Sequence, residues 1–333
     1  MSSNGLTLED LEASAIAAGS LRGRNVVILG GGRTGQATAA FAAGAGANVT
    51  VHDTDAIERV VGAAEAFAGS AIRTSFGDAE NLAPLLADAD VVVHSPAVTL
   101  GFPTVRPSIE RDLRDFAARA IPLAGESGAR GPVLISEPEW ALRLLGSRWR
   151  VGVTGTKGKS TTSNLIATIL ARDPSHPVEL GGNNGKPLIG RAASLPPETR
   201  VVIELSELQL PSLHSTVDVG VFTNVTVDHL DRHGSVGAYR SVKRLLADRI
   251  ADDGVMVVNL DDPVVAAYAG IGRVETVGYR LSSPVPGGVA LSTAGLSPLA
   301  YSAPRASVVG LLPPAQADAS CRWERSRSPE NTA

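Results

Sequence analysis

The chain has 333 residues, of which 44% are hydrophobic and 19% charged, which is enough for two or three globular domains with apolar cores. Its net charge of −4 and aromatic content of 4% disfavour a nucleic-acid-binding protein, because basic patches and base-stacking side chains are both scarce. A single cysteine, Cys321, excludes an internal disulfide framework and a cysteine-rich zinc site.

The N-terminal segment is acidic and lacks a signal-peptide core, and no apolar run reaches the length of a membrane span. We therefore expect a cytoplasmic protein without membrane insertion. The sequence does not set the oligomeric state, and a monomer is the default expectation.

Apolar strands alternate with helices from the start of the chain. Strands are predicted over 26–29, 49–51 and 91–93, and helices up to Ala45 and over 55–67 and 109–120. This alternation is typical of a doubly wound, mostly parallel α/β sheet. Gly30, Gly32 and Gly35, with Asp53 after the second strand, match a dinucleotide-binding fingerprint. Residues 1–122 are therefore predicted to form a Rossmann-like domain.

The fingerprint alone would suggest a nicotinamide oxidoreductase. However, a different diphosphate-linked ligand can use the same glycine turn and helix N-terminus, and no hydride-transfer constellation follows in the second half of the chain. A tight turn without any ligand is a further alternative.

A second alternation begins near residue 133. Strands are predicted over 133–135, 149–153, 200–205, 217–222, 255–259 and 274–277, and helices over 137–145, 160–171 and 236–250. We assign residues 123–282 to a central P-loop-type domain. Residues 283–333 are rich in Ser, Pro, Ala and Gly and have no clear periodicity, so we expect a disordered tail, in which 306–312 could form a strand.

The strongest chemical signal lies between Val151 and Thr162, where a strand runs into a glycine-rich turn and then a helix. Backbone N–H groups of such a turn bind phosphate oxygens, a lysine neutralises their charge, and a serine hydroxyl suits Mg²⁺. The turn is one residue longer than the common P-loop. The sequence predicts ATP binding by Gly155, Thr156, Lys157, Gly158, Lys159, Ser160 and Thr161.

Further polar clusters follow the phosphate turn along the chain. Asn183 lies in a turn whose amides can donate to a phosphate or sugar, and Glu204 ends an apolar strand, where a carboxylate is a natural Mg²⁺ ligand. His229 lies in an acidic and basic loop after another strand. Each residue alone is compatible with a structural role, but their order favours a metal and phosphate site.

The chain resembles the Mur ligases of bacterial cell-wall synthesis from about Asn25 to Tyr279. The matching segments are 154–162, 181–183, 204–206 with 209–210, 224–226 with 228–232, 239–243 and 259–262. The resemblance implies an ATP- and Mg²⁺-dependent ligase that joins glutamate to UDP-N-acetylmuramoyl-L-alanine through an acyl phosphate, in peptidoglycan precursor synthesis.

The resemblance also implies roles for individual residues. Lys159 would hold the nucleotide phosphates, Ser160 and Glu204 would bind one Mg²⁺, and His229 would bind a second. Lys243 matches a lysine that family members carbamylate, which turns a cation into an anionic metal ligand. Contacts to the UDP-linked substrate are implied for Arg33, Thr34, Gly35, Asp53, Thr54 and Asn183.

This chain also departs from the family pattern. Asp55 stands where arginine is common, Ala97 replaces the usual glycine, and Glu207-Leu208 replaces Ser-Phe before Gln209. After Asp262 we recognise neither the late His-Asn segment nor the third domain that closes over ATP, so we expect impaired turnover. The alternatives are a nucleotide-binding remnant without turnover and a folylpolyglutamate-type ligase, which the Rossmann-like first domain disfavours.

Overall fold

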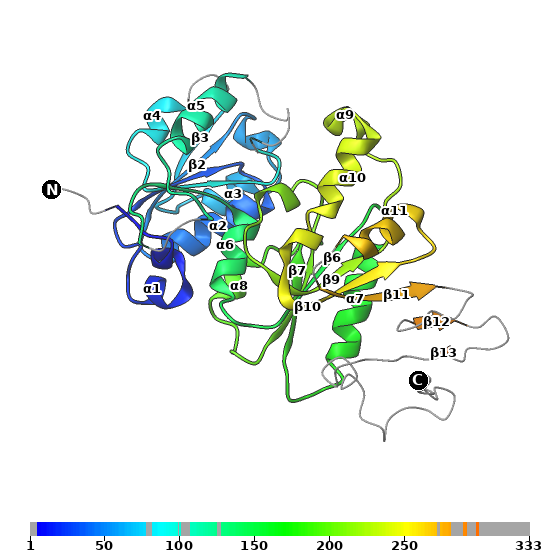
Figure 1. Ribbon diagram of the computed structural model, residues 1–333. Helices are drawn as coiled ribbons and strands as arrows, with labels where there is room; N and C mark the ends of the chain where they lie inside the picture. The colour runs from blue at the N-terminus through cyan, green and yellow to red at the C-terminus, as the bar shows by residue number, and fades with distance from the viewer. Residues whose placement is uncertain are drawn as a thin grey trace.

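The computed structural model describes residues 5–77, 82–98, 100, 107–124, 128–271, 274–280, 289–291 and 298–299. These residues form two α/β units, each built on a largely parallel sheet, with helix α6 between them (Figure 1). The predicted α/β fold is confirmed. In the described part of the chain, no helix is both long and apolar enough to cross a membrane.

The first sheet has five parallel strands in the order β3-β2-β1-β4-β5. This is the strand order of a Rossmann fold, so the predicted Rossmann-like domain is confirmed. The central strand β1 is apolar from Val26 to Leu29 because both of its faces are covered: Val26 and Ile28 face one core, and Val27 and Leu29 face another. The strands are β1 Asn25–Leu29, β2 Asn48–Asp53, β3 Arg73–Phe76, β4 Val91–His94 and β5 Val133–Ser136.

Helices cover both faces of this sheet. On one face, Ile109, Leu113 and Phe116 of α5 pack with Val92 of β4, at the i, i+4, i+7 spacing of an amphipathic helix. The helices are α1 Ala13–Ala17, α2 Arg33–Gly44, α3 Ala63–Phe67, α4 Ala83–Leu86 and α5 Pro107–Ala117, with 3₁₀ turns η1 Glu9–Leu11 and η2 Ile57–Arg59.

The helix predicted over 55–67 is wrong in its first half. The chain forms η2 there, and α3 begins only after Gly62, whose φ of 76° interrupts a helix. The edge strand β3 was not predicted, because Arg73 and Thr74 are exposed and the segment lacks an apolar run.

The second sheet has the order β13-β12-β11-β10-β9-β6-β8-β7 and is parallel except between β12 and β13. Its strands are β6 Arg150–Thr154, β7 Val178–Gly182, β8 Arg200–Glu204, β9 Val217–Phe222, β10 Ile250–Asn259, β11 Glu275–Arg280, β12 Val289–Leu291 and β13 Pro298–Leu299. Its helices are α6 Glu137–Leu144, α7 Lys159–Leu170, α8 Ile189–Ala192, α9 Leu230–His233, α10 Val236–Arg244 and α11 Pro263–Ala266, with η3 Leu210–Ser212, η4 Ala247–Arg249 and η5 Ala267–Gly270.

The strand predicted over 133–135 belongs to the first sheet and not to the central domain. The segment before it is held against the first domain, because Gly131 donates to the Leu6 carbonyl at 3.0 Å. Its strand, β5, then pairs with β4. The boundary between the sheets therefore lies after β5 and not at residue 122. In the predicted tail, β12 and β13 extend the second sheet, and the possible strand at 306–312 lies outside the described residues.

Helix α6 connects the two domains. Trp140 of α6 is fully buried, meets the Phe41 ring of α2 edge-on at 5.4 Å, and donates its indole N–H to the Leu11 carbonyl at 3.1 Å. On the other side, both oxygens of Glu139 accept hydrogen bonds from Ser215, in the loop before β9. One helix thus fixes the first domain against the second.

Candidate phosphate and metal site

The predicted site residues of the second domain meet at one edge of its sheet. Strands β8, β6 and β9 are neighbours and parallel, so their carboxyl ends lie together. Thr154, Glu204 and Phe222 are the last residues of these strands, and a predicted site loop follows each of them. Ligands of open α/β sheets bind at this edge.

The phosphate turn joins β6 to α7 through two glycines with positive φ, Gly155 at 150° and Gly158 at 79°. A Cβ on Gly155 would lie 1.9 Å from Thr223 Oγ1, so the turn packs directly against the loop after β9. The first N–H groups of α7 have no acceptor within the helix, and the helix dipole is positive at this end. Both features favour a bound anion.

Lys159 is the first residue of α7, and its ammonium lies over the turn. Nζ donates to the carbonyls of Gly155 and Thr156, each at 3.0 Å. Neither partner is a carboxylate, so these contacts do not neutralise the lysine, and its charge can interact with a phosphate. Ser160 and Thr161 follow on the first helical turn, and both are exposed.

The loop after β9 holds the phosphate turn in place. Asn224 Oδ1 accepts from the Lys157 N–H and its Nδ2 donates to the Lys157 carbonyl, both at 2.9 Å. Thr156 Oγ1 lies 3.0 Å from the Tyr239 hydroxyl and accepts from the Thr226 N–H at 3.0 Å. These segments matched a known family in the sequence, and the structure shows that they position the turn.

The Glu204 side chain is buried at the end of β8. Its Oε1 accepts from Asn183 Nδ2 at 3.0 Å, whereas its Oε2 is buried with no hydrogen-bond partner among the described residues. A buried carboxylate oxygen without a partner is costly unless a cation joins it. The site therefore fits Mg²⁺, a hard cation that prefers oxygen ligands. The described residues hold no cluster of three or more His, Cys, Asp or Glu suited to a metal, so hydroxyl, phosphate and water oxygens would complete the coordination.

Lys243 is fully buried on α10, directly behind the phosphate turn. Its Nζ lies 3.4 Å from Thr154 Oγ1 and 3.6 Å from Glu207 Oε2. Burial, and secondly the nearby Lys159 charge, lower the pKa of Lys243 to about 8, and the Glu207 carboxylate opposes this shift. At neutral pH this lysine loses its proton far more readily than a surface lysine.

The His229 imidazole lies near two carboxylates, those of Glu207 and Asp228. Its Nε2 lies 3.7 Å from Glu207 Oε1 and 3.9 Å from Asp228 Oδ2, and its φ of 48° is unusual for a residue other than glycine. A hydrogen bond from Lys157 at 3.0 Å lowers the pKa of Asp228 and keeps it ionised. The structure thus groups His229 with Lys243 around Glu207, a residue that the sequence analysis noted only as a departure from a family pattern.

The glycine turn of the first domain is closely packed. A Cβ on Gly35 would lie 1.8 Å from the Gly30 carbonyl oxygen, so only glycine fits at this position. Asp53 Oδ2 accepts from the Gly31 N–H at 2.7 Å, and its Oδ1 accepts from the Asp55 N–H at 3.0 Å. Asp53 therefore holds the turn, and its contact with substrate stays a prediction.

The substrate elements predicted in the two domains lie against each other. Arg33 and Thr34 begin α2, and Thr54 directly follows β2. The guanidinium of Arg33 lies 3.1 Å from the place of a Cβ on Gly185, in the same turn as Asn183. One extended ligand can therefore reach both turns.

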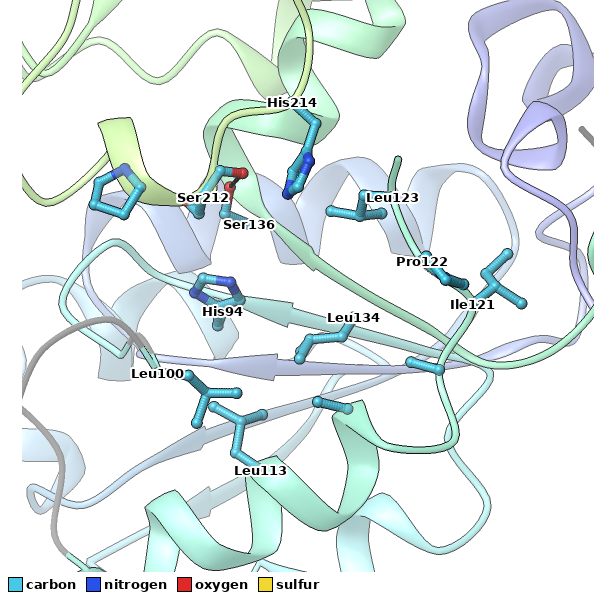
Figure 2. A pocket seen from close by; sticks show the side chains of 13 residues that line it. His94, Leu100, Leu113, Ile121, Pro122, Leu123, Leu134, Ser136, Ser212 and His214 are labelled. Atoms are coloured by element: carbon cyan, nitrogen blue, oxygen red, sulfur yellow. Dashed lines mark hydrogen bonds between the residues drawn. The ribbon is translucent and has the colours of Figure 1, made fainter. Parts of the chain in front are cut away.

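A separate cavity of about 390 Å³ lies between the two domains (Figure 2). His94, Ser136, Ser212 and His214 supply its polar lining, and the rest is mainly apolar side chains such as Leu113 of α5. Burial lowers the pKa of both histidines, so their imidazoles are neutral at pH 7. None of the predicted site residues lines this uncharged cavity, and no sequence pattern predicted it.

Two family models match the chain. The Mur ligase middle domain matches residues 153–285, and the C-terminal domain of alanine dehydrogenase/PNT matches residues 7–101. The second match covers the first Rossmann-like strands and their glycine fingerprint. It accounts for the dehydrogenase-like signal of that segment.

Curated relatives are named UDP-N-acetylmuramoylalanine–D-glutamate ligase. The protein from Anaeromyxobacter dehalogenans is 37% identical over 274 residues, which are 81% of this chain and 54% of that protein. The protein from Solibacter usitatus is 30% identical over 272 residues, 81% of this chain and 55% of that protein. The chain spans about half the length of the curated relatives it matches.

Among solved structures, the UDP-N-acetylmuramate:L-alanyl-gamma-D-glutamyl-meso-diaminopimelate ligase of Neisseria meningitides has a similar fold. The TM-score is 0.52 at 20% sequence identity, and the match covers 80% of each chain. At this identity the likeness concerns the fold alone.

Proposed function

The chain belongs to the Mur ligase family, and from that premise we propose that it is an ATP-dependent amide ligase that adds D-glutamate to UDP-N-acetylmuramoyl-L-alanine in peptidoglycan precursor synthesis. The observation that carries the proposal is the buried Oε2 of Glu204, which has no hydrogen-bond partner among the described residues and lies at the sheet edge that also carries the phosphate turn. A carboxylate in this place suits an enzyme that binds a nucleotide with Mg²⁺.

In the proposed reaction, the carboxylate of the UDP-linked substrate attacks the γ-phosphorus of ATP, which displaces ADP and forms an acyl phosphate. The amine of glutamate then attacks the acyl carbon, and phosphate leaves from the tetrahedral intermediate. Lys159 and the N–H groups at the start of α7 stabilise the charge on the phosphoryl oxygens during the first step. Bound Mg²⁺ would neutralise the phosphate charge further, and Ser160 and Glu204 are its proposed ligands.

The first domain supplies the site for the UDP-linked substrate. The glycine turn and the start of α2 suit the diphosphate, and Arg33 adds a positive charge beside it. From there the ligand would pass Asn183, whose side chain is bonded to Glu204. This path brings the reacting carboxylate to the ATP site. His229 and Lys243 line the far side of that site, where we propose a second Mg²⁺.

The alternative is a nucleotide-binding protein without turnover. A folylpolyglutamate-type reaction is less well supported, because the Rossmann-like domain and the Arg33 contact suit a nucleotide-linked substrate. A nicotinamide oxidoreductase does not account for the phosphate turn and Glu204.

The test is calorimetric titration of the 333-residue chain with Mg²⁺ and a non-hydrolysable ATP analogue, and separately with UDP-N-acetylmuramoyl-L-alanine. Assays of ATP-dependent product formation with D- and L-glutamate follow. Binding of both ligands, with slow product formation from D-glutamate alone, is the expected result. Binding of both without product favours the remnant, and binding of neither overturns the proposal.

A further inference from the structure

The proposed reaction makes no use of the cavity between the two domains. Its volume of about 390 Å³ lies in the range of small-molecule pockets, about 300–1,000 Å³. Leu113 and Ala117 of α5 line it from the first domain, and Ser212 and His214 line it from the second (Figure 2). Small-molecule sites often lie at such domain boundaries, so the chemistry of the lining decides what binds there.

The lining of the cavity is uncharged. No Asp, Glu, Lys or Arg is among the described residues that form it. Its ionisable groups are the imidazoles of His94 and His214, and burial lowers the pKa of both, so they are neutral at pH 7. Moving an ion out of water into this cavity is costly, because no opposite charge lines it to compensate. The cavity therefore disfavours nucleotides and other ions and favours an uncharged molecule.

The hydroxyl groups of the lining already donate their protons within the protein. Ser136 Oγ donates to the Ser212 carbonyl at 3.4 Å, and Ser212 Oγ donates to the Gln209 carbonyl at 3.0 Å. A hydroxyl has one proton and two lone pairs, so each can offer a ligand only acceptor capacity. Ser136 Oγ also accepts from the Glu139 N–H at 3.3 Å, which leaves Ser212 Oγ as the freer acceptor.

The His214 imidazole is a second group with unused acceptor capacity. In the described part of the chain, His214 makes a hydrogen bond only through its backbone N–H, which donates to Glu139 Oε2 at 2.8 Å. Its ring points into the cavity (Figure 2), and a neutral imidazole has one nitrogen that accepts a hydrogen bond. A ligand that donates a hydrogen bond would satisfy this nitrogen or Ser212 Oγ. Because the rest of the lining is mainly aliphatic, the body of such a ligand would be apolar.

We propose that this cavity binds a small, uncharged and mainly apolar molecule that carries one hydroxyl or N–H group. The apolar body lies against Leu113 of α5 and Leu134 of β5, and the donor bonds to His214 or Ser212. None of the residues proposed for the ligase reaction lines the cavity. Binding here therefore goes beyond the proposed function and does not depend on ligase activity.

The test titrates the unmodified chain with three related bicyclic probes. Indole is uncharged and donates an N–H, benzofuran has oxygen in place of that N–H, and indoleacetate is an anion. The chain has six histidines, so NMR spectra of histidine-labelled protein report on each imidazole separately. We expect indole to shift the His94 and His214 signals saturably and to leave the signal of His176, which lies outside the cavity, unchanged. Benzofuran should bind about fivefold more weakly for lack of the donor, and indoleacetate should shift neither signal.

A cavity-filling variant establishes where the probe binds. Ala117→Leu, at a position of α5 that lines the cavity, occupies space that indole needs, so indole affinity should fall about tenfold or more. Ala118→Leu makes the same change at the next position, which is exposed and outside the cavity, and is the matched control. His94→Gln and His214→Gln assign the two signals. Thermal unfolding establishes that each variant is folded.

Loss of the indole-dependent shifts in Ala117→Leu, with the shifts retained in Ala118→Leu, is the expected result. No saturable shift of either signal in the unmodified chain overturns the proposal, as do shifts that persist unchanged in a folded Ala117→Leu variant. An affinity for indoleacetate or for benzofuran equal to that for indole overturns the proposed ligand class. If Ala117→Leu does not fold, the three probes on the unmodified chain decide.

Discussion

At the scale of single residues, we expect the charge of Lys159 to dominate the proposed phosphate site, because its ammonium donates to two neutral carbonyls. A charge-assisted contact with a phosphate is worth about 1.5–3 kcal/mol, so Lys159→Ala should weaken binding of the Mg²⁺-ATP analogue by about tenfold or more. Calorimetry measures this, and Arg172→Ala, an exposed cation at the far end of α7, is the control. Unchanged affinity in the lysine variant would show that the turn does not bind nucleotide.

The positions of Lys159 and Glu204 at one edge of the sheet could be predicted from the sequence, since Glu204 ends an apolar strand and Lys159 lies in the turn and helix that follow another. The clustering of His229 and Lys243 around Glu207 could not, because it depends on how α10 packs behind the turn. The sequence signal was present, however: Glu207 stands where the family commonly has serine. A charged residue in place of a small polar one beside a candidate metal site is a reason to look for compensating charges.

At the scale of elements, the phosphate turn depends on close packing against the loop after β9. Gly155→Ala would put a methyl group 1.9 Å from Thr223 Oγ1, so the turn must shift. Gly158→Ala meets no atom within 4 Å and costs only the strain of its positive φ. We expect Gly155→Ala to lower the free energy of unfolding by roughly 1–3 kcal/mol more than Gly158→Ala, measured by urea denaturation. Equal stabilities would contradict the packing described for this turn.

Helix α6 carries a pH-dependent contribution to stability. Burial raises the pKa of Glu137 from 4.5 to about 7, and a hydrogen bond from the Ile189 backbone only partly opposes this. At pH values between 4.5 and about 7, the Glu137 carboxyl group is protonated in the folded chain and ionised in the unfolded chain. The contribution is therefore complete below pH 4.5 and is lost as pH rises to about 7, a change of about 3 kcal/mol.

Glu137→Gln should remove this dependence. Between pH 5 and pH 8, the unmodified chain should lose roughly 2–3 kcal/mol more unfolding free energy than the variant, measured by urea denaturation at both values. Glu198→Gln, at an exposed position, serves as the control and should follow the unmodified chain. Parallel pH profiles for the unmodified chain and Glu137→Gln would mean that the carboxyl group is not buried as described.

Element positions were predictable where the local pattern is strong, as in β1 and α7. The placement of β5 was not predictable, because the residues of a single apolar strand do not indicate which of two sheets the strand joins. Its assignment comes from its parallel pairing with β4, and Gly131, just before the strand, bonds to Leu6, more than 120 residues away along the chain. The sequence predictions missed edge strand β3 and the interruption of the helix at Gly62 for a different reason. The local pattern is weak in both segments, and tertiary packing overrides it.

At the scale of the whole molecule, α6 and the contact of Arg33 with the Asn183 turn bring two ligand sites together. Ligands in the two sites should therefore affect each other, and thermodynamic linkage requires the effect to be reciprocal. The ATP analogue with Mg²⁺ should change the affinity for UDP-N-acetylmuramoyl-L-alanine by the same factor that the UDP-linked ligand changes the affinity for the analogue. Calorimetric titrations in both orders measure the two factors, and unequal factors would mean that one titration does not report binding at a single site.

Arg33 separates the two proposed sites experimentally, because it belongs to the first domain and its guanidinium lies against the Asn183 turn of the second. Arg33→Ala should weaken binding of UDP-N-acetylmuramoyl-L-alanine by about tenfold, through loss of a charged contact with the diphosphate. It should leave the affinity for the Mg²⁺-ATP analogue alone unchanged. Arg59→Ala, at an exposed arginine of η2, is the control and should alter neither. An equal loss of affinity for both ligands would mean that Arg33 belongs to the ATP site or to the packing between the domains. Unchanged affinity for both would mean that the first-domain turn does not bind the UDP-linked substrate.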